Sequence, residues 1–198
     1  MTHPDAILWQ SAQNILRAQG NLDKLFEAFS LVECSNTDLT IEDVCADGAD
    51  DQFLQPVWNC FFVVKRSNRK NAKVAGVLTM AIQLTSEEGN EGEWTHGRRA
   101  KVLVGYSPYA DVENAWNFTT SSPNQGGYVE KCISSGRHWT IGDQSDSSWF
   151  YAVPLDHLIG TREVRELIVK PVHKILRSNT VDEGLATIAE KLCLPPGS

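Results

Sequence analysis

Two apolar runs joined by a short polar segment constrain the fold of this chain more than any other feature. The runs are VWNCFFVVK at residues 57–65 and KVAGVLTMAIQL at residues 73–84, and RSNRKN connects them. Both runs are rich in β-branched and aromatic residues, and the connection is rich in turn-forming residues, so the pattern predicts a β-hairpin. Because the runs are almost continuously apolar, we expect both of their faces to be covered. Gly76 predicts a bulge or a close approach of another group.

Three more strands are expected further along the chain. They are AKVLVGYS at residues 100–107, HWTIGD at 138–143 and SSWFYAVPL at 147–155. Residues 126–135 are expected to form a helix, because paired glycines open the segment and Gly136 follows it, as glycine often follows a helix. The irregular segment before this helix contains large aromatic residues, so we expect it to lie over a core or a pocket.

The two ends of the chain are predicted to be helical. Apolar residues recur at helical spacing in residues 5–31, where Gly20-Asn21 allows two short helices or one broken helix. Residues 161–178 repeat in the same way, and Pro171 should kink or split that helix. Residues 180–183 have the pattern of a capping box for a last helix. The fold class is therefore α/β in the α+β sense, a single domain over residues 1–198 with a central antiparallel sheet of about five strands and helices at both termini.

Charge is distributed unevenly along the chain. The net charge is −7 and the pI is near 5.2, and this disfavours binding to nucleic acid. Residues 33–56 are acidic and lack periodicity, so we interpret them as an acidic loop. A basic hairpin tip follows directly, and its candidate partner-binding residues are Lys65, Arg66, Arg69 and Lys70. The tip fits a solvated turn, a patch for an acidic protein partner, or a group of charges neutralised by the chain's own acidic loop.

Cysteine usage favours a cytoplasmic setting. The chain has five cysteines, an odd number, with no C-x-x-C pair and no basic-then-apolar segment at its start. We therefore expect free thiols in a reducing compartment and no disulfides. No apolar run approaches the roughly 18 residues that span a bilayer, so no membrane partner is expected.

One stretch of the chain resembles a known family. The order of helix, strand hairpin and irregular segment, followed by GGYVEKCISSGRHWTIGDQ at residues 126–144 and WFYAVPL at 149–155, resembles the GAF domain, a sensor fold related to PAS. The resemblance extends over residues 5–160, and the helical extension at residues 161–198 departs from it, because GAF domains usually continue with a turn and another strand. It implies a cavity lined by the helix and strands, and either a small ligand such as a cyclic nucleotide or a role in dimerisation. A bilin pigment is not implied, because Ile133 rather than His follows Cys132.

The candidate ligand-binding residues gather around this stretch and are mostly aromatic. Aromatic walls with a few polar groups are typical of small-molecule pockets, and plain core packing is the alternative. Trp149 and Tyr151 alternate with Phe150, so we expect them to share one face of a strand. The predicted set is Trp116, Phe118, Gly127, Tyr128, Trp139, Asp143, Trp149 and Tyr151.

No catalytic or metal-binding residues are assigned. Cys132, His138 and Asp143 have the residue types of a nucleophile, base and orienter, but Cys132 is expected on the core face of a helix. The histidines are scattered without metal-ligand spacing, and the cofactor is unknown.

The sequence thus favours a non-catalytic domain that senses a small ligand or transmits a signal. The alternatives are a protein-interaction module without a ligand and an enzyme with a dispersed site. A homodimer built on the terminal helices is also expected, because the sheet has too little free surface to cover both apolar stripes. The stripes are Ile7, Leu8, Ile15 and Leu16 in the first helix and Leu185, Ile188 and Leu192 in the last.

Overall fold

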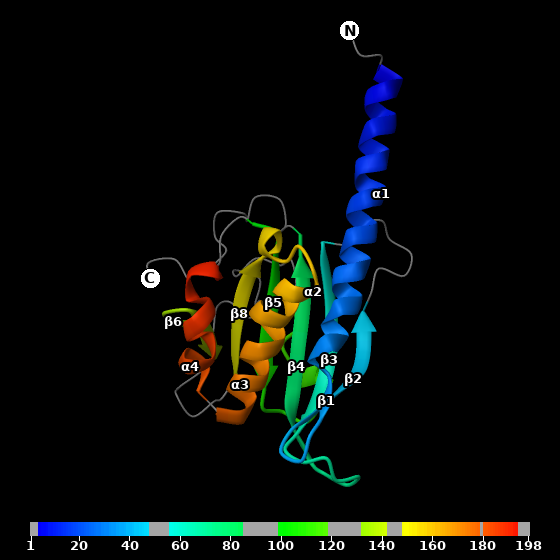
Figure 1. Cartoon of the computed structure of the whole chain (residues 1–198). Coiled ribbons are helices and arrows are strands. Elements are labelled where there is room, and N and C mark those ends of the chain that lie inside the picture. The colour runs from blue at the N-terminus through cyan, green and yellow to red at the C-terminus, as the bar shows by residue number, and fades with distance from the viewer. Residues whose placement is uncertain are drawn as a thin grey trace.

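The computed structural model describes residues 4–47, 56–84, 99–118, 132–141, 148–178 and 180–193. Within this part of the chain, all strands belong to one eight-stranded sheet with the order β1-β2-β3-β4-β5-β8-β7-β6, and every neighbouring pair is antiparallel. Helices lie at both ends of the chain (Figure 1). The prediction of an antiparallel sheet with terminal helices is confirmed, and the sheet has more strands than the expected five.

The strands follow the chain almost in order. Their bounds are β1 Cys34–Ser35, β2 Thr40–Asp47, β3 Val57–Lys65, β4 Val74–Gln83, β5 Lys101–Ser107, β6 Cys132–Ser135, β7 His138–Ile141 and β8 Trp149–Pro154. The predicted hairpin is confirmed as β3 and β4, with a shift of register between Val64 and Lys65. Gly76 lies beside this irregularity, where an added Cβ would lie 2.3 Å from the carbonyl oxygen of Ser107. The expected close approach is therefore present.

Two segments have a different secondary structure from the one predicted. β1 and β2 lie within residues 33–56, which were expected to form an acidic loop. β2 is the outer partner of β3, and its Glu42 and Asp43 are exposed, so the acidic residues lie at the side of the sheet rather than in a loop. β6 lies within the expected helix at residues 126–135, and Gly136 has φ of 62° in the two-residue turn between β6 and β7. Residues 132–135 of the expected helix are therefore a strand, and residues 126–131 lie outside the described residues.

The first helix is long and unbroken. α1 runs from Pro4 to Ala28 and continues into a short 3-10 turn, η1 Phe29–Val32. It passes through Gly20 without a break, and an added Cβ at Gly20 would meet nothing within 4 Å. Figure 1 shows the C-terminal part of α1 beside the sheet and the N-terminal part extending beyond it.

A helical layer covers one face of the sheet (Figure 1). Its elements are η5 Leu155–His157, α2 Thr161–Val164, the π-helical turn η6 Arg165–Val169, α3 Lys170–Ser178, α4 Val181–Leu185 and the 3-10 helix η7 Ala186–Lys191. A short 3-10 turn, η2 Val112–Asn114, follows β5. Thr180 is the N-cap of α4 but makes no side-chain capping hydrogen bond there, so the predicted capping box is not formed. Among the described residues, no helix has the length and hydropathy to cross a membrane.

Pro171 neither breaks nor splits its helix. Instead the π turn η6 directly precedes it, and the helix continues as α3. Proline has no N–H to donate to the carbonyl four residues earlier, which is that of Leu167. The hydroxyl of Tyr151 on β8 donates to this carbonyl oxygen at 3.2 Å. The sheet therefore supplies the hydrogen bond that the proline removes.

The two faces of the sheet have separate cores. The main core lies between the sheet and the helices and includes the buried side chains of the C-terminal stripe, Leu185, Ile188 and Leu192. A smaller cluster lies on the other face, around Leu103 and Phe150. The sheet thus divides two apolar interiors of unequal size.

Candidate functional site

The structure divides the predicted aromatic residues between the two faces of the sheet. Trp149 and Tyr151 share the helix-covered face, as their alternation predicted. Trp116, Phe118 and Trp139 belong to the cluster on the opposite face. These rings therefore do not surround a single cavity. Gly127, Tyr128 and Asp143 are outside the described residues, and a binding role for any member of the set stays a prediction.

Trp149 and Tyr151 serve the main core. The ring centroids of Trp149 lie 6.0 Å from Tyr106 and 6.1 Å from Tyr151, and both pairs are stacked. Tyr151 is completely buried, and its hydroxyl is bonded to the π turn. Burial raises the pKa of Tyr151, so this hydroxyl stays a neutral donor.

Four buried rings pack together on the opposite face, and we call them the aromatic cluster: Trp116, Phe118, Trp139 and Phe150. Phe150 is at its centre. Its centroid lies 4.8 Å from Trp139 in a parallel stack, 4.9 Å from Trp116 and 5.5 Å from Phe118 in edge contacts. These spacings lie in the range that aromatic pairs prefer.

Gly105 allows Trp116 to lie directly on β5. A Cβ at this position would be 2.6 Å from Cδ1 of Trp116, a distance that van der Waals repulsion forbids. Trp116 is held there by two hydrogen bonds, from its indole N–H to the Tyr106 carbonyl at 3.0 Å and from its backbone N–H to Oγ of Ser107 at 3.1 Å. The expectation that the segment after β5 lies over a core is confirmed for this residue and for Phe118.

Several buried polar side chains lie on the same face as the aromatic cluster, and we call four of them the polar row: Asn59, Thr79, Gln83 and Lys101. Asn59 pairs with Ala81 of the cluster, and its Nδ2 donates to the carbonyl of Phe118 at 3.0 Å. In the described part of the chain, neither Oδ1 of Asn59 nor Oγ1 of Thr79 has a hydrogen-bond partner. Buried polar atoms normally have one, so these two are exceptions among the described residues.

Lys101 is the residue that sequence reasoning missed. It begins β5 between Gln83 of β4 and Pro154 of β8, and only 3 % of its surface is exposed. A buried lysine is rare because its ammonium loses water. That loss lowers the pKa of Lys101 to about 8. The charge of Arg99 also lowers this pKa, whereas Cys193 raises it. The only signal that the sequence offered is a lysine at the start of a strand rich in apolar residues.

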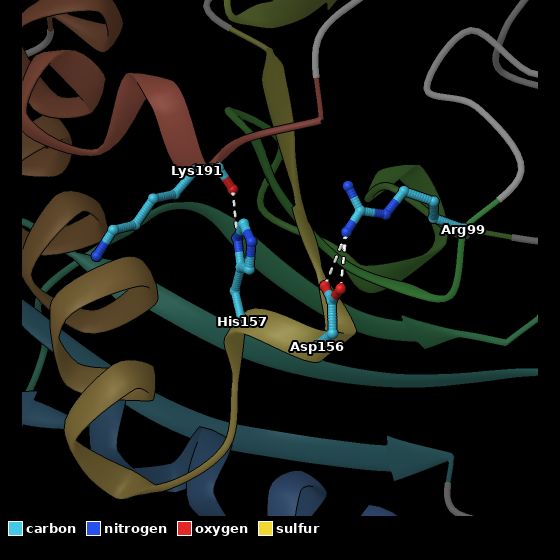
Figure 2. A network of polar contacts seen from close by, with 4 residues as sticks. All are labelled: Arg99, Asp156, His157 and Lys191. Atoms are coloured by element: carbon cyan, nitrogen blue, oxygen red, sulfur yellow. Dashed lines mark hydrogen bonds and ion pairs between the residues drawn. The ribbon is translucent and has the colours of Figure 1, made fainter.

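A network of polar contacts holds the segments around Lys101 in place (Figure 2). Nη2 of Arg99 donates to both carboxylate oxygens of Asp156 at 2.9 Å, and Nδ1 of His157 lies 3.1 Å from the carbonyl oxygen of Lys191. Figure 2 shows the Lys191 side chain pointing away from the Arg99–Asp156 pair. The pair is half exposed, so its net contribution to stability is small, and its role is positional.

Cys193 connects the end of the helical layer to the sheet. Its N–H donates to the carbonyl of Ala152 at 2.9 Å, along the part of β8 beyond its pairing with β7. Burial raises the pKa of the Cys193 thiol, with Lys101 and Arg99 acting in the opposite direction. The thiol is therefore a weakly acidic neighbour of Lys101. Cys193, Cys34 and Cys60 are not in disulfide bonds.

The predicted basic tip forms the turn between β3 and β4. Lys65 is bonded to Glu42 of β2, so the neighbouring acidic strand neutralises this one charge. Arg66, Arg69 and Lys70 are exposed, and the first two line a hollow of about 800 Å³ with Lys73 and polar residues. Binding of a partner at this tip stays a prediction.

Of the residue types considered for catalysis, Cys132 and His138 are not cross-strand partners. Cys132 pairs with Ile141 rather than with His138, and Asp143 lies outside the described residues. Nδ1 of His138 is instead 3.5 Å from a carboxylate oxygen of Asp182. Burial lowers the pKa of His138, and the Asp182 carboxylate opposes this. No group of three or more potential metal ligands occurs among the residues whose positions are described.

In comparisons with known proteins, no family model, no curated protein and no solved structure matches the chain.

Proposed function

We propose that this protein is a small-ligand-binding regulatory domain, of the sensor kind implied by the GAF resemblance, and that its ligand binds on the sheet face opposite the helices. The observation that carries the proposal is a buried lysine on the same face as the aromatic cluster. A protein that needed only a core at this place would be more stable with an apolar side chain there. Buried polar groups retained at a cost in stability are typical of binding sites.

The chemistry of the face defines the class of ligand. The aromatic cluster favours a flat apolar group, which would stack against rings that pack on one another in the unbound protein. The ammonium of Lys101 attracts a carboxylate or a phosphate, and Asn59 and Thr79 offer oxygens to a donor group on the ligand. The ligand is therefore a planar or aromatic compound with one anionic group.

Binding of such a ligand is expected to depend on pH. An anion beside Lys101 stabilises its charged form and raises the pKa, which is about 8 without a ligand. Binding therefore requires proton uptake by the neutral fraction of Lys101, and the affinity falls as the pH rises above about 8. A ligand that contacts only the aromatic cluster lacks this dependence.

Native mass spectrometry of protein purified gently from cells tests the proposal. We expect an additional mass that is lost on denaturation. Lys101→Met should remove it, whereas the matched control Lys191→Met, at an exposed side chain nearby, should retain it. The proposal fails if no small molecule co-purifies and if aromatic carboxylates and phosphates cause no thermal shift.

A further inference from the structure

The N-terminal half of α1 extends beyond the sheet (Figure 1). Large apolar side chains of this half are exposed, with exposed fractions of 56 % for Ile7, 70 % for Leu8, 63 % for Trp9, 37 % for Ile15 and 53 % for Leu16. Soluble monomers rarely leave such a cluster in water, and a helix that extends from its domain has no core of its own to bury it. The C-terminal stripe is buried in the main core, so only the α1 stripe remains for a partner.

The exposed residues belong to a heptad pattern that continues into the core. Six residues of α1 are spaced alternately by three and four, as the a and d positions of a heptad are. We call them the seam: Leu8, Ser11, Ile15, Ala18, Leu22 and Leu25. Phe29 continues the same pattern. The last two seam residues are buried by the chain's own core, whereas the first four are exposed. All charged residues of α1 lie outside the seam. Such a pattern is the one by which two helices pack together.

An apolar groove lies at the base of the same helix. Its volume is about 680 Å³, and one wall is formed by α1, through the seam residues Ala18, Leu22 and Leu25 together with Asn21, Lys24 and Ala28. The opposite wall is formed by η5, α2 and the residues between them, including Leu158 and Ile159. Ile159 is 84 % exposed at the rim. The groove is therefore open, apolar and adjacent to the buried half of the seam.

We propose that two copies of this chain pair through antiparallel α1 helices, so that the first turns of each α1 enter the groove of the other copy. In an antiparallel coiled coil, a positions meet d positions. Leu8 then lies at the level of Leu25 of the second copy, and Ile15 at the level of Ala18. Ile7, on the flank of the seam, reaches the level of Ala28 in the groove wall.

Antiparallel pairing covers more of the exposed surface than parallel pairing. A parallel seam ends at Ala18, where the chain's own core occupies the helix face, and it leaves both grooves empty. The exposed side chains of Ile7, Leu8 and Ile15, with the surfaces that cover them on two copies, form a small interface, close to the lower limit of roughly 1,200 Å² for stable interfaces. A dimer with a dissociation constant in the micromolar range is therefore expected.

Light scattering coupled to size-exclusion chromatography, over roughly 5–200 µM protein, tests the pairing. The wild type should approach twice the chain mass of 22.0 kDa at the upper concentrations. Ile15→Glu should stay monomeric, because a carboxylate in the seam weakens pairing at least about 100-fold. The matched control is Leu16→Glu, which changes a neighbouring exposed residue outside the seam and should remain dimeric.

Ile159→Glu distinguishes the two orientations. It changes the exposed rim of the groove, far along the chain from α1, and should also give a monomer with an unchanged circular dichroism spectrum. A wild type that is monomeric throughout, or that forms larger assemblies, overturns the proposal. A dimer that survives Ile159→Glu overturns the antiparallel arrangement, and one that survives Ile15→Glu overturns the seam. These outcomes do not depend on whether a ligand is bound.

Discussion

Replacing Lys101 by Met should stabilise the protein, although it removes a charged residue from its interior. Met has a similar length and no charge, so its side chain occupies the space of the aliphatic part of Lys101 with little change in packing. The pKa of Lys101 falls from 10.5 to about 8 on folding, and the largest cause is the loss of water around the ammonium. Folding therefore carries a cost for the charged form, and Lys101→Met removes that cost.

The size of the effect follows from the pKa. At about 1.36 kcal/mol for each pH unit, the fall in pKa corresponds to about 3 kcal/mol at neutral pH. Met also loses the contacts that the ammonium makes, so we expect a net gain of about 2 kcal/mol. For a chain of this length, that gain raises Tm by about 4–8 °C.

The gain should depend on pH in a defined direction. Between about pH 8 and pH 10.5, the unfolded chain holds more protons on Lys101 than the folded chain does, so wild-type stability from this group rises with pH. Below about pH 8 the full cost is present, and above 10.5 it is absent. The difference between the variant and the wild type should therefore be largest at pH 7 and should shrink towards pH 10.

Urea unfolding followed by tryptophan fluorescence measures this difference at pH 7, 8.5 and 10. Both proteins are first unfolded and refolded without ligand, because a bound ligand stabilises the wild type alone. Lys191→Met is the control, with an expected change within about 0.5 kcal/mol. A Lys101→Met variant less stable than the wild type at pH 7, or a difference that does not vary with pH, would refute the reasoning.

Three further substitutions test the packing by the same unfolding measurement. Gly105→Ala should destabilise by about 2–3 kcal/mol, because the new Cβ displaces Trp116, and a neutral result would show that the indole does not lie on the strand. Tyr151→Phe should cost about 1–2 kcal/mol, because the Leu167 carbonyl beside the π turn loses its donor, and no loss would mean that another group satisfies that oxygen. Gly20→Ala should stabilise by about 0.5–1 kcal/mol, since the added methyl group meets nothing, and a loss of stability would argue against a continuous helix there.

The strands that were correctly predicted from the sequence are those in which β propensity and burial in the sheet favour the same structure. Val57–Lys65 and Val74–Gln83 are long apolar runs in the interior of the sheet, where β propensity and burial act together. Thr40–Asp47 was missed because its exposed acidic residues have low β propensity and its pairing with β3 is not a local property. Cys132–Ser135 was misread because a glycine with positive φ ends helices and also turns hairpins.

The candidate site shows the same division between local and non-local information. Alternation correctly placed Trp149 and Tyr151 on one face of their strand. Whether Trp139 shares that face depends on its pairing with Phe150, and this register is set across strands. Lys101 was missed because one lysine at the start of a strand has no motif. The burial of Lys101 results from its packing between two neighbouring strands and the C-terminal segment, and this packing is not a local property of the sequence.

The position of β8 has a consequence for synthesis on the ribosome. Before residues 149–154 emerge, the chain contains β1–β5 as one partial sheet and the β6–β7 hairpin as another, with no strand to join them. β8 then bonds β5 on one side and β7 on the other. Until that moment the nascent chain presents open strand edges, which are prone to pair with other chains. At about 5–20 residues per second, the waiting time between the completion of β5 and the arrival of β8 lasts several seconds. A slowly translated segment between these strands should therefore increase co-translational aggregation, whereas the same delay after Cys193 should not.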